Sequence, residues 1–207
     1  MSIVTYNNRS IANISAIPGA AKSLTHIKTL TASSSSSISF VDGSSDVVLD
    51  STYPIYVFKF INIHPATNDV IYQFNLSTDS GSNYNVTKTS TFFRAYHTES
   101  DGTPALAYAS GDDLAQSTSY QNLDQNGLGN GSDESESGSL TLFNPSSTTF
   151  VKHFIATTQY YQSGDASYNA YIAGYGNTTS AVDAIQFKFS SGNIDAGTIK
   201  LYGLKDS

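Results

Sequence analysis

The chain contains no cysteine and no tryptophan, and charged residues make up only 13% of its 207 residues. Without cysteine, the protein has no disulfide, no thiolate nucleophile and no cysteine-ligated zinc. Ten Lys and Arg stand against 17 Asp and Glu, for a net charge of −7. This leaves no basic patch to neutralise phosphates, so we expect no nucleic-acid binding. No apolar run approaches the roughly 20 residues of a membrane helix, so we expect no membrane insertion.

Short runs of aromatic and β-branched residues cover most of the chain, separated by turns rich in Gly, Ser, Asn and Asp. Such runs predict strands. In 54–62 both alternating faces are apolar, which is typical of a central strand. About ten strands of this length fit a single-domain, all-β fold, a two-sheet antiparallel β-sandwich of jelly-roll or lectin-like type. The expected strands include 25–32, 37–41, 54–62, 70–77, 90–97, 149–158, 168–175, 184–190 and 197–203.

Residues 1–21 differ from the sandwich domain expected over 22–207. Their apolar residues fit neither a helix nor a strand period, and Pro18-Gly19 closes the segment. We interpret 1–21 as an extended N-terminal arm that docks on a neighbouring protein; an end folded back on its own domain is the alternative. No apolar core follows a basic start here, which predicts synthesis without a signal peptide. The docking residues expected are Ile3, Val4, Tyr6, Ile11, Ile14 and Ile17.

The segment 98–138 is expected to be one long acidic loop inside the sandwich. A connection of this length is uncommon and points either to function or to disorder. Only 110–117 has helical character, with Ser110 as N-cap. The oxygen-rich stretch with Asp124, Asn130, Asp133 and Glu134 is a weak candidate for calcium, although its spacing does not match an EF-hand. A solvated acidic loop is the alternative.

No catalytic constellation stands out in the sequence. The four histidines, His26, His64, His97 and His153, fall in or beside expected strands and form no HExxH motif. No serine lies in a GxSxG turn. We therefore expect a protein that is not an enzyme and that needs no cofactor.

Tyrosines are the best candidates for recognition, because a tyrosine ring can stack on a ligand while its hydroxyl stays solvated. The residues expected to contact a ligand or receptor are Tyr160, Tyr161, Tyr171 and Tyr175. Alternation puts Tyr171 and Tyr175 on one face of their strand and Tyr168 on the other. Packing in the core or across strands is the alternative for most of them.

Three segments carry a family resemblance: 190–203 (SSGNIDAGTIKLYG), 91–97 (TFFRAYH) and 61–65 (INIHP). With most of 24–204, they resemble structural proteins of marine tailed bacteriophages, including phages of cyanobacteria. The resemblance implies a location in the virion, assembled in the host cytoplasm. It transfers no catalytic residue, and it does not say whether the protein belongs to the tail or to the head.

The expected function is therefore display on a virion. We expect a non-enzymatic surface protein, a tail-associated fibre or receptor-binding knob, which binds other virion proteins through its arm and a host surface glycan or receptor through its sandwich. A capsid decoration protein is the alternative within this class, and a free carbohydrate-binding module is the alternative from another class. By analogy with other knobs, we expect a homotrimer.

Overall fold

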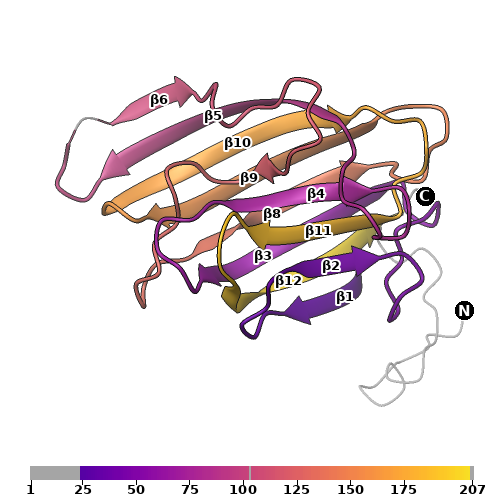
Figure 1. Ribbon diagram of the computed structural model, residues 1–207, viewed down its shortest axis with the longest axis horizontal. Coiled ribbons are helices and arrows are strands. Elements are labelled where there is room, and N and C mark those ends of the chain that lie inside the picture. Colours follow the sequence, from indigo (N-terminus) through magenta and orange to yellow (C-terminus); the bar gives the residue numbers. More distant parts are fainter. Residues whose placement is uncertain (1–23, 103, 206–207) are drawn as a thin grey trace, which may run out of the picture.

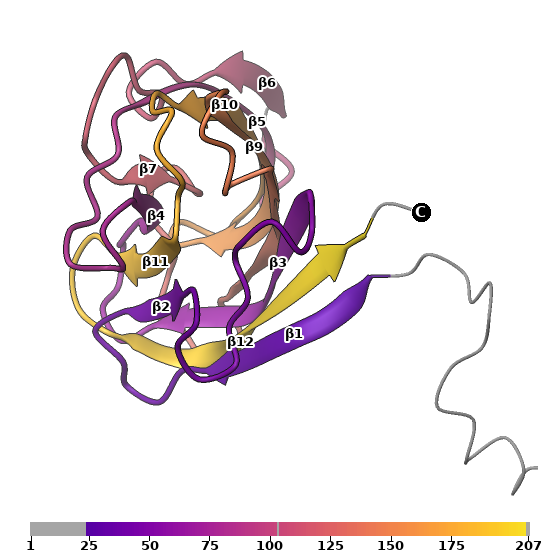
Figure 2. The same ribbon diagram turned by 90° about the vertical axis from the view of Figure 1, so that its right-hand side faces the viewer.

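The computed structural model describes residues 24–102 and 104–205, and its regular structure there is entirely β. Two antiparallel sheets pack face to face (Figures 1 and 2), which confirms the predicted sandwich. The predicted arm, 1–21, lies outside the described residues. The strands are β1 (Thr25–Thr31), β2 (Ile38–Val41), β3 (Ile55–Pro65), β4 (Tyr72–Ser77), β5 (Lys88–Thr98), β6 (Ala105–Tyr108), β7 (Gln121–Asn122), β8 (Glu136–Phe143), β9 (Lys152–Gln162), β10 (Ala166–Gly176), β11 (Ala184–Phe189) and β12 (Ile194–Leu204).

The eight-stranded sheet has the order β1-β12-β3-β8-β9-β10-β5-β6, and the four-stranded sheet has the order β2-β11-β4-β7. As predicted, β3 is central, because it pairs with β12 on one side and with β8 on the other. Figure 2 shows the four-stranded sheet lying against one face of the larger sheet. Among residues 24–102 and 104–205, no second layer covers the opposite face of the larger sheet.

The segment 98–138 is not one continuous loop. It adds β6 to the edge of the large sheet and β7 to the edge of the small one, and β8 begins at Glu136. The helix predicted for 110–117 is wrong. The backbone there hydrogen-bonds to β5 instead: Ser90 N–H donates to Leu114 O at 2.9 Å, and Leu114 N–H donates to Ser90 Oγ at 2.9 Å. These contacts with a distant strand outweigh a weak local helix propensity.

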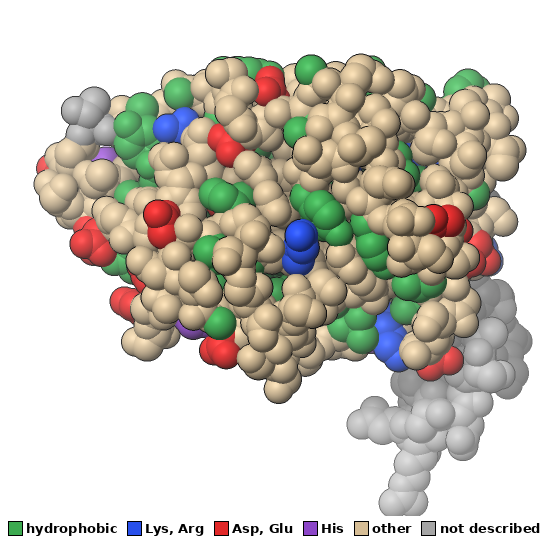
Figure 3. Space-filling view, in the orientation of Figure 1, with side chains coloured by type: hydrophobic (Ala, Val, Ile, Leu, Met, Phe, Trp, Pro, Cys, Tyr) green, Lys and Arg blue, Asp and Glu red, His purple; other side chains and the backbone are tan. Residues whose placement is uncertain are grey.

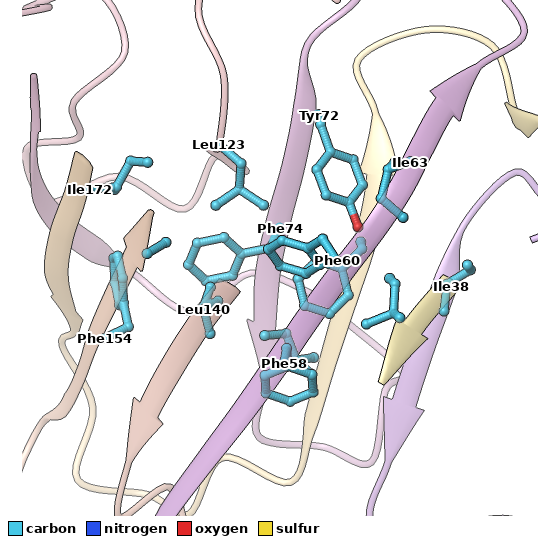
Figure 4. Close-up of a cluster of buried hydrophobic side chains, with 14 of the residues drawn as sticks. Ile38, Phe58, Phe60, Ile63, Tyr72, Phe74, Leu123, Leu140, Phe154 and Ile172 are labelled. Carbon is cyan, nitrogen blue, oxygen red and sulfur yellow. The ribbon is translucent and has the colours of Figure 1, made fainter. Parts of the chain in front are cut away.

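The core is an aromatic cluster between the sheets, centred on Phe187 of β11. Its ring centroid lies 5.2 Å from that of Phe60 and 5.5 Å from that of Phe58, both on β3. It also lies 6.1 Å from Tyr72 and 6.4 Å from Phe74, both on β4. Figure 4 shows Phe58, Phe60, Tyr72 and Phe74 close together within this cluster of buried side chains. The predicted alternation of β3 is therefore confirmed, with its aromatic row facing inward.

A paired irregularity bends β3 and β12 at one end of the sheet. The register shifts between Phe60 and Ile63, and again between Ala196 and Thr198 on the opposite strand. Gly197 takes a φ of +119°, which strains any residue with a side chain, and a Cβ there would lie 2.7 Å from Asn62 O. Only glycine fits this crossing.

The face of the molecule in Figure 3 is mostly uncharged, with isolated acidic and basic side chains among polar and backbone atoms. This matches a sequence that is poor in charge. Within residues 24–102 and 104–205 there is no helix long and apolar enough to span a membrane.

Replacing the central ring tests the role of the cluster. Phe187 is fully buried, so Phe187→Ala is expected to lower the free energy of unfolding by about 3–5 kcal/mol through lost burial and a cavity. The matched control is Phe150→Ala, since Phe150 is 70% exposed and its loss is expected to change stability by less than about 0.5 kcal/mol. Urea denaturation followed by circular dichroism measures both. Equal effects would contradict a core centred on Phe187.

Candidate functional site

The uncovered face of the eight-stranded sheet carries the candidate site. Along β5, β9 and β10, alternate side chains point away from the small sheet, and we call these three outward rows the outer track. On β9 the row runs from His153 to Tyr161, about 27 Å at the usual rise of a strand. The track consists of Thr89, Thr91, Phe93, Ala95 and His97 of β5, His153, Ile155, Thr157, Gln159 and Tyr161 of β9, and Ser167, Asn169, Tyr171, Ala173 and Tyr175 of β10.

A stacked aromatic pair lies in the middle of the outer track. Phe93 and Tyr171 are direct cross-strand neighbours, with ring centroids 4.9 Å apart and planes only 7° from parallel. Tyr108 of β6 is the next neighbour of Phe93, and its hydroxyl donates to Asp113 Oδ2, which raises the pKa of the phenol. About two-fifths of each stacked side chain is exposed, at 41% for Phe93 and 40% for Tyr171. The pair therefore offers aromatic surface to solvent on a backbone that is hydrogen-bonded on both sides.

One end of the track opens into an apolar hollow of about 470 Å³. Ile155, Ala173 and Tyr175 form much of its wall, and the ring of His153 lies edge-on to Tyr175 at 6.2 Å. A second hollow shares Phe143 and His153 with it and extends to Phe150, which is 70% exposed. We call the two hollows the apolar groove.

The other end of the track opens into a polar groove. It consists of two adjoining hollows. One, of about 390 Å³, is lined by Glu99, Gln159 and Tyr161, and the other, of about 480 Å³, is lined by Asn62 and His64. Asp133 and Ser135 line both hollows. Glu99 beside Tyr161 raises the pKa of that phenol to about 12. No Lys or Arg lines any of these hollows within the described part of the chain. The site is neutral at one end and acidic at the other.

The structure divides the four tyrosines predicted to contact a partner. Tyr161 and Tyr171 lie on the outer track, and Tyr175 lies there half-buried. Tyr160 must be removed from the set, because it is completely buried and its hydroxyl donates to Gln125 O at 2.8 Å while accepting from Gln125 N–H at 2.8 Å. Strand alternation separates Tyr160 from Tyr161. Tyr168 faces inward, as expected from its alternation with Tyr171.

Other exposed residues of this surface were missed in the sequence. Phe93 follows the buried Phe92 in the sequence. Alternation along 90–97 shows that these two side chains lie on opposite faces of the strand, but it does not show which face the second sheet covers. Leu106 and Tyr108, 73% and 55% exposed, belong to a strand in the segment expected to be a loop. Ile155 is 53% exposed within a strand that otherwise packs well.

The proposed calcium residues do not converge. Asp124 is fully buried and accepts Tyr72 N–H at 2.6 Å. Glu134 instead accepts Gly131 N–H, and Asn130 N–H donates to Asn68 Oδ1 at 3.2 Å. Asp133 lines the polar groove. Within 24–102 and 104–205, no group of three or more His, Asp or Glu is placed to hold a metal ion.

Asp124 belongs to a buried carboxyl pair with Glu136, between the two sheets. Both side chains are inaccessible, and neither Asp124 Oδ1 nor the Glu136 oxygens have a hydrogen-bond donor among the described residues. Burial raises the pKa of Asp124 to about 8, and burial beside Asp124 raises the pKa of Glu136 well above its ordinary value. The two carboxyls therefore hold a proton near neutral pH, because two adjacent buried charges are costly. Neither can reach a dissolved substrate, so their effect is on stability.

The carboxyl pair predicts that stability falls as pH rises. Between about pH 4 and 8, a carboxyl whose pKa is raised by folding keeps its proton in the folded chain but has lost it in the unfolded chain. Each pH unit in this range therefore lowers the free energy of unfolding by on the order of 1.4 kcal/mol for one such group. Asp124→Asn keeps an acceptor for Tyr72 N–H and removes one of the two carboxyls, so it is expected to reduce this slope, and buried Glu136 supplies the remainder. Asp133→Asn, at a carboxyl in the solvated groove, is the control.

Urea unfolding between about pH 5 and 7 measures the slope in the wild type and in both variants. This window lies below the pH range in which buried Lys88, with a pKa lowered to about 7, adds the opposite trend. A slope in Asp124→Asn equal to that of the wild type would overturn the assignment.

The resemblance to phage structural proteins has no support from comparison with known proteins, and it stays a prediction. No protein-family model matches the chain, and neither the curated proteins nor the solved structures contain a significant match.

Proposed function

We propose that the protein is a non-catalytic structural component of a bacteriophage particle, displayed on its surface as a tail-associated receptor-binding knob. The observation that carries the proposal is the outer track, an exposed aromatic surface on the uncovered face of a well-packed sandwich. Contiguous exposed apolar residues mark sites of interaction, whereas apolar residues scattered singly do not. The resemblance of 190–203, 91–97 and 61–65 supplies the virion context.

The rigidity of the scaffold supports a recognition role. β10 is hydrogen-bonded along its whole length to β9 and to β5, so the outward side chains of these strands hold a fixed spacing. A preorganised surface loses less conformational entropy on binding than a flexible loop does. The aromatic pair is thus positioned before any partner arrives.

The topology supports different places for the proposed attachment and the proposed recognition. The described chain enters the fold at β1, one edge of the large sheet, whereas β5 and β6 form its other edge. With strands about 4.8 Å apart, the two edges lie on the order of 30 Å from each other. We propose that attachment lies on the β1 side of the sandwich and that the outer track stays accessible on the particle. Other virion proteins are the proposed partners of the arm. The assembly is proposed to form in the host cytoplasm, and the knob is proposed to be a homotrimer.

Copy number in purified particles tests the location. A tail-associated knob is expected at a few to a few dozen copies per particle, because tail fibres are few. Quantitative mass spectrometry against a labelled standard, with the major capsid protein as internal reference, gives the number. Hundreds of copies would replace the knob by the capsid decoration protein, and absence from particles would remove the virion proposal.

Deleting residues 2–21 tests the arm. The deletion is expected to leave the strand content and melting temperature of the domain close to those of the full chain and to abolish incorporation into particles. Circular dichroism and immunoblots of particles made with each form measure the two effects. Unfolding of the truncated chain would show instead that 2–21 belongs to the core.

A further inference from the structure

We propose that the outer track binds an uncharged, hydroxyl-rich glycan chain laid along β9, β10 and β5, from the apolar groove to the polar groove. This inference rests on the proposed function, because it names the chemical class of the receptor. It commits the surface to a polysaccharide and not to a protein partner. Shape, chemistry and charge support it separately.

The shape is that of an extended ligand. Both grooves open on the outer track, and the stacked pair lies between them. The row on β9 alone runs about 27 Å from His153 to Tyr161. The exposed aromatic residues Tyr108, Phe93 and Tyr171 are neighbours across β6, β5 and β10, and rows of hydroxyl and amide side chains adjoin them along the strands. A protein partner of ordinary affinity buries a broad area of roughly 800 Å² on each side.

The track combines an aromatic surface with polar groups, and a sugar ring likewise has an apolar face and a polar edge. A pyranose ring presents a face of C–H groups, which packs on an aromatic ring, and an edge of hydroxyls, which need donors and acceptors. Phe93 and Tyr171 supply the aromatic surface at the centre. Gln159, Glu99 and Asp133 supply amide and carboxylate groups in the polar groove. Two carboxylate oxygens can accept from adjacent hydroxyls of one sugar.

Charge decides which glycans are accepted. Glu99, Asp133 and Glu134 line the polar groove, and no Lys or Arg of the described residues lines it to offset them. Arg94 does not offset these carboxylates either, because its guanidinium lies over the rings of Tyr96 and Tyr168, and Tyr168 is buried on the inward side of the sheet. With a net charge of −7, the protein would repel sulfated, sialylated or uronic-acid chains. The geometry therefore points to neutral glycans.

The test uses the full-length protein on a glycan array that carries neutral hexose and N-acetylhexosamine chains beside sulfated and uronic-acid chains. Binding is expected to neutral chains of several sugars and not to acidic ones. Affinities for the best neutral probe are then measured by calorimetry. No binding to any neutral chain, or stronger binding to the acidic chains, would overturn the inference.

Two tyrosine variants localise the site. Tyr171→Ala removes half of the stacked pair and is expected to weaken binding at least about ten-fold. Tyr202→Ala is the matched control, since Tyr202 lies on the same sheet face but on β12, four strands away from β10, and it is expected to change affinity less than about two-fold. Because Tyr171 stacks on Phe93, the variant is expected to melt a few degrees below the wild type and to stay folded at the temperature of the binding assay. Equal losses in both variants would place the glycan elsewhere.

A carboxylate variant tests the other end of the site. Glu99→Gln keeps the size of the side chain in the polar groove and removes its charge. It is expected to weaken binding of the neutral probe several-fold and to reduce discrimination against acidic chains. Unchanged affinity and unchanged discrimination would remove the polar groove from the site.

The outcomes separate this inference from the proposed function. A protein found in particles that binds no neutral glycan fails the inference alone. A protein that binds neutral glycans through Tyr171 but is absent from particles fails the virion proposal alone, and is then a free carbohydrate-binding module. Recovery of a protein partner whose binding depends on Tyr171, with no glycan bound, would reassign the track to a protein interface.

Discussion

The contact between Phe187 of β11 and the aromatic row of β3 is the interaction on which the rest of the structure depends. Each sheet has one apolar face, and neither face is stable in water, since burial of a side chain such as Phe stabilises by roughly 1.5–3 kcal/mol. Phe58, Phe60 and Tyr72 surround Phe187 and join the two sheets in one cluster. With no disulfide in the chain, this packing and the strand ladders hold the sandwich together.

Burying one row of side chains on each strand leaves the next row outside, and this determines which side chains form the outer track. Phe92 and Tyr160 are buried, and their neighbours Phe93 and Tyr161 lie on the outer track. The same period that builds the core thus builds the surface, and the backbone ladder makes both rigid. A partner that binds the track meets side chains whose positions the core has already set.

The interior also holds ionisable groups that oppose each other in their dependence on pH. The Asp124–Glu136 pair costs stability as pH rises, because its raised pKa values favour the protonated fold. Lys88 is buried, donates to Val86 O at 2.8 Å, and has its pKa lowered to about 7, so it costs stability as pH falls toward that value. Both groups lie between the sheets, where desolvation, and not ion pairing, is the dominant cause of the shift.

The sequence by itself determined the fold class, most strand positions and the central place of the strand at 54–62, because the period of two and the apolar content of a strand are local properties of the chain. Only the tertiary structure decided the rest. β6 and β7, of four and two residues, are too short to show a period and form because β5 and β4 offer them an edge. Asp124 looked like part of a solvated loop, but its partner Tyr72 lies 52 positions away in the sequence. Which of two adjacent aromatic residues is exposed depends on which face of the sheet another sheet covers, and that is a property of the packed molecule.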